Sequence, residues 1–184
     1  MKVRIHSLVM NFSDEGTRNG IPLLFIHGFP FSSAMWHPQV AHFSKAFRVI
    51  KYDIRGHGES EAGDAQFSIE YFVDDILALL EFLHIPRAII IGLSMGGYIA
   101  LRMYERFPEK FLGLVLCDTK SDADTNEGKI RRAQQALQVK VEGAELYARA
   151  FAQAVFFEKS FQRNPNAVAF IKKIIAATSP LAIA

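Results

Sequence analysis

The sequence lacks several features that would direct it to a specialised class of protein. Cys117 is its only cysteine, so no disulfide can form within the chain, and we expect a reducing compartment such as the cytoplasm. No stretch approaches 18 consecutive apolar residues, and the N-terminus lacks the apolar segment of a signal peptide, so we expect no membrane partner. The net charge of +2 gives no basis for nucleic-acid binding.

Signals for metals and phosphate-bearing cofactors are also missing. No pair of histidines or cysteines has the spacing of a zinc site. The glycine-rich stretch 92–97 lacks the lysine of a P-loop. We therefore expect a protein that works without a metal and without a cofactor.

What the sequence does contain is an alternation of predicted strands and helices over its first two thirds. Short apolar runs predict strands at 3–10, 21–26, 47–52, 88–91 and 111–117, with a turn at 11–20. Helical spacing predicts helices at 33–46, 68–83 and 94–106. This order is typical of an α/β fold, with a mostly parallel sheet and helices on both faces.

After Asp118 the pattern changes to helical spacing alone. We therefore divide the chain into an α/β core at 1–120 and a helical part at 121–184, in which Gly143 and the turn 164–166 separate about three helices. Such a helical insert after a strand is either a lid over a site at the strand ends or a set of ordinary surface helices.

The strongest chemical signal is Ser94 in the run Gly92-Leu93-Ser94-Met95-Gly96, between a buried strand and a helix. A sharp strand-to-helix turn lifts a serine oxygen above the sheet, and small residues two before and two after it allow the close approach. The unpaired N–H of Met95 at the helix start can stabilise an oxyanion. We predict that Ser94 is a nucleophile.

Two further motifs follow predicted strands. His27-Gly28-Phe29-Pro30 comes after the strand 21–26, where this architecture places its second oxyanion donor, which we assign to the backbone N–H of Phe29. For His27 we favour a structural role over a catalytic one. The run 53–60 is a charged turn with two glycines; we expect its residues Asp53 and Arg55 to pair, and we favour a structural role for His57 as well.

Together, the motifs HGFP (27–30), DIRGHGES (53–60) and GLSMGG (92–97) resemble the α/β-hydrolase superfamily. The resemblance, supported by the stretch 115–125, is to the branch of 3-oxoadipate enol-lactonase-like enzymes, carboxylesterases and cofactor-free haloperoxidases. It implies that Ser94 attacks a carbonyl, that a histidine activates it and an acid orients that histidine. It also implies that Phe29 and Met95 form the oxyanion hole and that 121–178 is a helical cap after the sixth strand.

The sequence departs from that pattern beyond Ser94. In this fold the order is serine, acid, histidine, but all the histidines precede Ser94: His6, His27, His37, His42, His57 and His84. Asp118 is a candidate acid, although a structural role suits it better. A complete sheet needs two more strand–helix units, or about 60–80 residues, so we expect the last two strands to be missing, with the usual acid and histidine.

Two kinds of function are consistent with this reading. The first is a serine hydrolase, catalytically incomplete as given, that acts on a small and mostly apolar ester or lactone; perhydrolysis is a related option. Its substrate would contact His27, Gly28 and Phe29, together with Phe151 and Phe156, unless these two hold the cap helices in place. The second is a non-catalytic binding or interaction protein that keeps the fold, or a fragment that needs a C-terminal partner piece.

The predicted strand 111–117 carries a further expectation. Without the last two strands it would form an apolar edge of the sheet with unpaired backbone groups. We expect this edge to pair with another chain, which is either a second copy in a homo-oligomer or a C-terminal partner piece.

Overall fold

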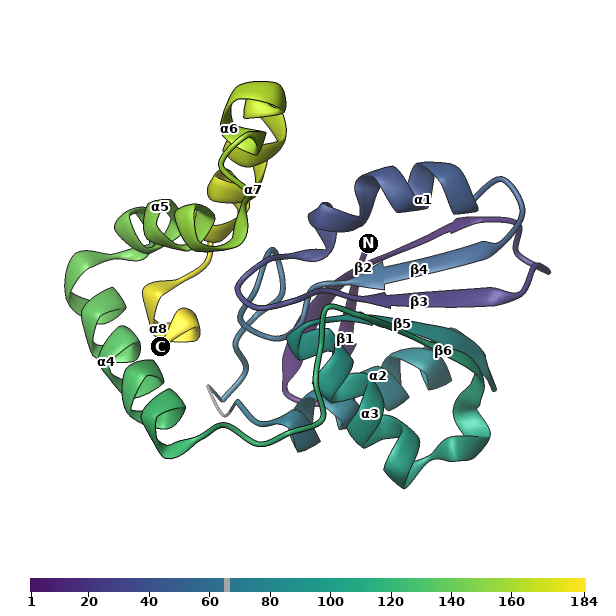
Figure 1. Ribbon diagram of the computed structural model, residues 1–184. Helices are drawn as coiled ribbons and strands as arrows, with labels where there is room; N and C mark the ends of the chain where they lie inside the picture. The colour runs from purple at the N-terminus through teal and green to yellow at the C-terminus, as the bar shows by residue number, and fades with distance from the viewer. Residues whose placement is uncertain (65–66) are drawn as a thin grey trace. The chain divides into compact units, whose positions relative to one another are not determined.

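The computed structural model describes residues 1–64 and 67–184 and divides them into two compact units, Met1–Ser121 and Asp122–Ala184 (Figure 1). The first unit contains one six-stranded sheet in the order β1-β2-β4-β3-β5-β6. Its last four strands in that order run parallel, and β1 and β2 add an antiparallel hairpin. The strands are β1 (Lys2–Ile5), β2 (Leu8–Gly16), β3 (Pro22–Ile26), β4 (Arg48–Tyr52), β5 (Ala88–Leu93) and β6 (Phe111–Cys117). The mostly parallel α/β sheet predicted from the sequence is therefore confirmed.

The N-terminal hairpin differs from the prediction. A single strand at 3–10 and a turn at 11–20 were expected, but the chain turns at His6, which adopts a φ of 51°, and β2 then continues to Gly16. Leu8, Met10 and Phe12 are buried in alternation with more exposed neighbours. An antiparallel strand with one solvated face tolerates polar residues at every second position, so the polar stretch that resembled a turn is a strand.

Helices cover both faces of the sheet in the first unit (Figure 1). The Ser68 hydroxyl accepts a hydrogen bond from the N–H of Tyr71, 3.2 Å away, and so caps α2, where the sequence predicted a helix from residue 68. The predicted helix 33–46 consists of a 3-10 turn and a shorter α1, with Pro38 in the first turn, where its missing N–H costs nothing. The helical elements are η1 (Ser33–Trp36), α1 (His37–Phe43), α2 (Ile69–Phe82), α3 (Met95–Arg106) and η2 (Pro108–Lys110).

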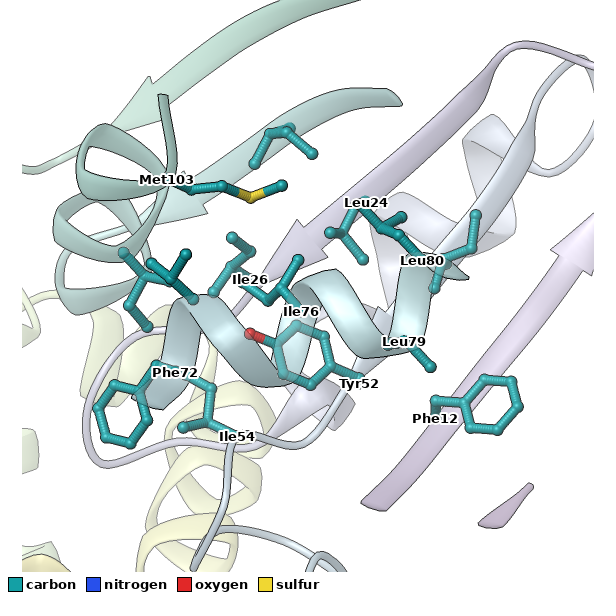
Figure 2. Close-up of a cluster of buried hydrophobic side chains, with 14 of the residues drawn as sticks. Phe12, Leu24, Ile26, Tyr52, Ile54, Phe72, Ile76, Leu79, Leu80 and Met103 are labelled. Atoms are coloured by element: carbon teal, nitrogen blue, oxygen red, sulfur yellow. The ribbon is translucent and has the colours of Figure 1, made fainter. Parts of the chain in front are cut away.

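The larger hydrophobic core lies between the sheet and helices α2 and α3. Figure 2 shows Ile76 and Leu80 of α2 beside Leu24 and Ile26 of β3, with Met103 of α3 nearby. Each of these side chains is almost completely buried. A smaller cluster packs the opposite face of the sheet against η1 and α1. Burial on both faces fixes the strands, and therefore the loops at their carboxyl ends.

All the regular secondary structure of the second unit is helical. Small or aliphatic side chains fill its interior, including Ala148, Ala152, Val168 and Ile175. Three long helices agree with the predicted number of about three, and two short helices of four residues each accompany them. They are α4 (Asn126–Glu142), α5 (Ala144–Val155), α6 (Ser160–Arg163), α7 (Pro165–Ala176) and α8 (Pro180–Ile183). In the described parts of the chain, none of the helices has the length and apolar character needed to cross a membrane.

Candidate active site

The carboxyl ends of β3 and β5 lie side by side in the middle of the sheet. The chain leaves β3 to form β4 on one side and returns to form β5 on the other, and Ile26 of β3 is in register with Gly92 of β5. Loops that diverge from neighbouring parallel strands in this way open a crevice, which is where open α/β sheets bind ligands. The loop 27–32 and the turn at Ser94 both begin there.

Ser94 occupies a sharp turn between β5 and α3. It has φ 50° and ψ −113°, a conformation that a residue with a side chain rarely adopts. Such a residue costs about 1–3 kcal/mol and persists only where its surroundings enforce it. Ser94 is partly exposed, and within the described residues its hydroxyl has no hydrogen-bond partner. The strained strand-to-helix turn predicted from the glycine spacing is confirmed.

Two glycines make this turn possible. A Cβ atom on Gly92 would collide with the backbone of Gly96 and Gly97 in the first turn of α3. A Cβ atom on Gly96 would collide with the carbonyl oxygens of Ile26 and His27 at the end of β3. The spacing of the motif therefore reflects close contact of three backbone segments, as the sequence predicted.

The end of β6 holds the backbone of Ser94 in this conformation. The N–H of Ser94 donates to the carbonyl of Cys117 over 3.0 Å, and the hydroxyl of Thr119 donates to the carbonyl of Ser94 over 2.8 Å. The Thr119 side chain also occupies the space that a Cβ on Gly97 would need. The role of Thr119 could not be predicted from the sequence, because a threonine after a strand has no pattern that links it to a turn 25 residues away.

The loop after β3 is fastened by His27. The ring of His27 is completely buried, its Nδ1 lies 2.9 Å from the carbonyl of Gly28, and its Nε2 lies 3.0 Å from the N–H of Ile54. The N–H of Ile54 must donate to Nε2, so Nδ1 carries the hydrogen. Burial and then the neighbouring His57 lower the pKa of His27 to about 3, which keeps the ring neutral. The predicted structural role of His27 agrees with these contacts.

The carboxylate of Asp53 connects this loop to the loop after β4. It accepts hydrogen bonds from the N–H of Ser33 (2.7 Å), the side-chain amide of Asn11 (2.8 Å) and the N–H of Glu59 (3.0 Å). Burial alone would raise the pKa of Asp53, but these donors outweigh it and hold the pKa below its usual value. Asp53 therefore remains a charged acceptor that organises three segments.

Arg55 does not pair with Asp53, contrary to the prediction. Its guanidinium makes two hydrogen bonds of 2.8 Å to the carboxylate of Asp75 in α2, and both partners are buried. Asp64 lies 3.4 Å from the same guanidinium. The prediction was wrong because Asp53 already accepts three donors, and because the facing residue of α2 cannot be identified from the local sequence.

His57 packs beside the loop after β3. Its ring centroid lies 5.3 Å from that of His27 and 6.2 Å from that of Phe29. Nδ1 is 3.1 Å from the carbonyl of Arg55, whereas the buried Nε2 has no protein partner within the described residues. Burial lowers the pKa of His57, so this ring is neutral as well.

The other predicted site residues lie in three places. Gly28 packs closely against the carbonyl of Leu93, from which an added Cβ would be 3.2 Å away, and Met95 is the first residue of α3, directly after Ser94. Asp118 is exposed at the end of β6 with a φ of 41°. Phe151 and Phe156 belong to the second unit, where their rings pair with Tyr147 (5.9 Å) and Phe161 (6.3 Å).

Residues 21–159 match the sequence profile of the α/β-hydrolase fold. The chain belongs to the α/β-hydrolase family. The family suggested by the three sequence motifs is thus confirmed.

The similar proteins include lactonases and esterases. The chain is 32% identical over 127 residues to 3-oxoadipate enol-lactonase 2 of Acinetobacter baylyi, an alignment that covers 69% of this chain and 48% of that protein. An esterase of Thermogutta terrifontis with bound malate superimposes with a TM-score of 0.93 and 32% identity, covering 100% of this chain and 69% of the esterase. The enol-lactonase of Burkholderia xenovorans LB400 gives a TM-score of 0.92 and 30% identity, covering 100% of this chain and 70% of that enzyme.

The alignments therefore reach only part of these relatives. The chain spans about half the length of the curated enol-lactonase and about 70% of the two solved structures. These comparisons establish the family and the fold of this chain.

Proposed function

We propose that this chain carries the nucleophile and the oxyanion-binding part of a serine hydrolase that acts on esters or lactones. The observation that carries the proposal is the geometry of Ser94, a partly exposed serine at φ 50° between β5 and the first turn of α3. Structures keep such strain where the conformation itself is useful. Attack by its hydroxyl oxygen on the carbonyl carbon would form an acyl-enzyme as the C–O bond to the alcohol oxygen breaks and that oxygen takes up the serine proton. Water would then attack the acyl carbon, break its bond to Ser94, release the acid and return a proton to the serine oxygen.

The oxyanion would be stabilised by two backbone N–H groups. Met95 lies at the N-terminus of α3, where N–H groups point out of the helix and the helix dipole favours negative charge. Phe29 follows Gly28, which packs against Leu93 in the turn that holds Ser94. We assign the second donor to Phe29 on this proximity. Each such donor contributes on the order of 3 kcal/mol to the transition state in related chemistry.

The described residues do not place a general base beside the hydroxyl of Ser94. No histidine follows Ser94 in the sequence, and none of the described histidines bonds to its hydroxyl. His27 and His57 use their Nδ1 atoms on carbonyl groups. We infer that the 184 residues alone turn over esters slowly, because a serine hydroxyl without a base is a poor nucleophile near neutral pH. Asp118 is our candidate for an acid near the turn.

The proposed substrate is a small, mostly apolar ester or lactone. The relatives named as esterase and enol-lactonase support an ester or a lactone, whereas small size and apolar character remain part of the proposal. Within the first unit, Gly28 and Phe29 are our candidates for contact with the substrate through their backbone and, for Phe29, its half-buried ring. Because the ring of His27 is buried, we assign it to the support of this loop. We keep Phe151 and Phe156 as candidates for an apolar wall.

Chemical rescue would test the proposal directly. Hydrolysis of p-nitrophenyl acetate is followed with and without added imidazole, in the original chain and in Ser94→Ala, whose rate gives the background of imidazole itself. We expect a slow Ser94-dependent rate that imidazole raises, because a diffusible base can accept the serine proton that none of the described histidines is placed to take. Equal rates in the two proteins at every imidazole concentration would contradict the proposal.

The second candidate function is a binding protein that keeps the fold without catalysis. The observation that favours it is the hydroxyl of Ser94, which has no activating partner among the described residues. A folded chain with no Ser94-dependent turnover, even with imidazole, that still binds an ester or lactone would support this alternative. The same result excludes the hydrolase for these 184 residues.

A further inference from the structure

An open groove lies in the first unit, at the edge of the sheet opposite to that of Ser94. Its volume is about 740 Å³, within the usual size of small-molecule sites. Ile85 and Pro86 of its lining precede β5, whereas Ser94 follows the other end of that strand. We propose that this groove binds a small organic cation, an ammonium group carried on an apolar body, separately from the serine site.

The floor of the groove is apolar. Leu80 of α2 and Ile85 are almost completely buried, and Leu77 and Phe107 are half-buried beside them in the lining. Figure 2 shows Leu80 next to Leu24 of β3, so this floor is continuous with the larger core of the unit. A floor held by core packing is formed before the ligand arrives, and it offers apolar contact to the body of a ligand.

Two carboxylates reach the lining without a partner of opposite charge. Glu81 lies in the last turn of α2 and Glu109 lies in η2, and both are exposed. Over residues 1–64 and 67–184, neither carboxylate forms a hydrogen bond or an ion pair. Lys110 also belongs to the lining, and its single charge can balance one of the two carboxylates at most. The groove therefore combines an apolar floor with a net negative charge.

The carboxyl ends of two helices add to this negative charge. α2 and α3 both end at the groove, where Glu81 and Phe107 belong to the lining. The helix dipole makes such an end favourable for a cation and unfavourable for a carboxylate. Glu81 is therefore unfavourably placed, and the last turn of α2, all of which is described, contains no basic residue. Arg106 in the last turn of α3 is already paired with Glu70 and Asp74. This charge pattern selects a cation over a neutral or an anionic ligand.

Three ligands that share a phenyl body test the preference for a cation. Binding of phenethylammonium, 2-phenylethanol and phenylacetate to the 184-residue chain is measured by NMR titration at pH 8, where an ordinary histidine is neutral. We expect the cation to bind, the alcohol to bind at least about threefold more weakly, and phenylacetate to bind more weakly still. Equal affinities for the three ligands, tightest binding of phenylacetate, or no binding of the cation overturns the proposal.

Removal of the two carboxylates locates the site. Glu81→Gln and Glu109→Gln should each weaken the binding of phenethylammonium about two- to fivefold, and the double variant should bind the cation and the alcohol equally. The matched control is Glu15→Gln, which removes the same charge from an exposed position at the end of β2, outside the lining. Its dissociation constant should equal that of the original chain.

Two further measurements separate this site from the fold and from the proposed hydrolase. The thermal midpoint of Glu81→Gln should not fall, because the substitution removes a carboxylate from the unfavourable end of a helix. Ser94→Ala, which lacks the proposed nucleophile, should bind phenethylammonium with the affinity of the original chain. An affinity that is unchanged in the double variant, equally reduced in Glu15→Gln, or lost in Ser94→Ala overturns the proposal.

Discussion

The loops after β3 and β4 and the turn after β5 reach the same edge of the sheet but are built in opposite ways. In the two loops, buried side chains accept or donate hydrogen bonds across segments: Asp53 accepts three, and His27 bridges Gly28 and Ile54. At the turn, Ser94 is strained, and its hydroxyl has no described partner. The difference indicates that the loops supply stability, whereas the turn gives up stability for the position of one oxygen.

The largest loss of stability should come from removing the carboxylate of Asp53, which accepts hydrogen bonds from both loops. Asp53→Ala leaves the N–H groups of Ser33 and Glu59 and the amide of Asn11 without their acceptor. We expect a loss of about 3–5 kcal/mol in the free energy of unfolding, measured by denaturant titration. The matched control is Asp14→Ala, which removes a carboxylate bound to Arg48 at the far end of the sheet and should cost less. If Asp53→Ala lowers the free energy of unfolding by less than Asp14→Ala does, the hydrogen bonds of these two loops are not a main source of stability.

The next largest loss of stability should come from a side chain at Gly96, where α3 approaches the end of β3 closely. In Gly96→Ala the added methyl group would meet the carbonyl oxygens of Ile26 and His27. Overpacking of this kind costs about 1–3 kcal/mol. Gly128→Ala is the control, because Gly128 lies in α4, where its nearest contact would be 3.4 Å away and alanine favours the helix. Thermal melts should show a lower midpoint for Gly96→Ala only; equal midpoints would refute the packing argument.

The free energy of unfolding should fall at acid pH, because His27 and His57 are neutral and buried in the loops after β3 and β4. Because the pKa of His27 falls from its usual 6.5 to about 3 in the folded state, the unfolded chain takes up a proton first as the pH falls. Stability contributed by the neutral ring is complete above about pH 6.5 and declines below it, by about 1.4 kcal/mol per pH unit. His57, whose pKa is also lowered, adds to this slope.

Unfolding titrations between pH 7 and pH 5 measure this slope. The variant His57→Gln removes one of the two contributions, so its stability should decline less steeply with falling pH than that of the original chain. A stability that rises as the pH falls through this range would contradict the neutral, buried state of both rings.

The smallest effect on stability is expected at Ser94 itself. Ser94→Ala removes a hydroxyl that has no described partner, so the free energy of unfolding should change by less than about 0.5 kcal/mol. Ser94→Gly relieves the positive φ and should be at least as stable as Ser94→Ala. A loss of more than 1 kcal/mol in Ser94→Ala, on the scale of an ordinary hydrogen bond, would show that the hydroxyl is structural.

The sequence predicted the turn at Ser94 better than the hydrogen bonds that hold the site in place. The glycine spacing and the flanking apolar strand identify Ser94, because the constraint is local: strand, turn and helix are adjacent in the chain. The partners that hold the site come from distant positions, such as Thr119 for the carbonyl of Ser94 and Asp75 for Arg55. No local pattern marks these pairs. The polar half of β2 was missed for a similar reason, since its partner β4 begins 32 residues after β2 ends.

Covalent labelling tests whether Ser94 is a nucleophile. The folded chain is treated with a fluorophosphonate probe and the modified residue is located by mass spectrometry of its peptides, with Ser94→Ala as the control. We expect a single adduct on Ser94 that forms slowly, forms faster with imidazole and is absent from the variant. An adduct on another residue, an equal adduct in Ser94→Ala, or no adduct in folded protein with imidazole would contradict it.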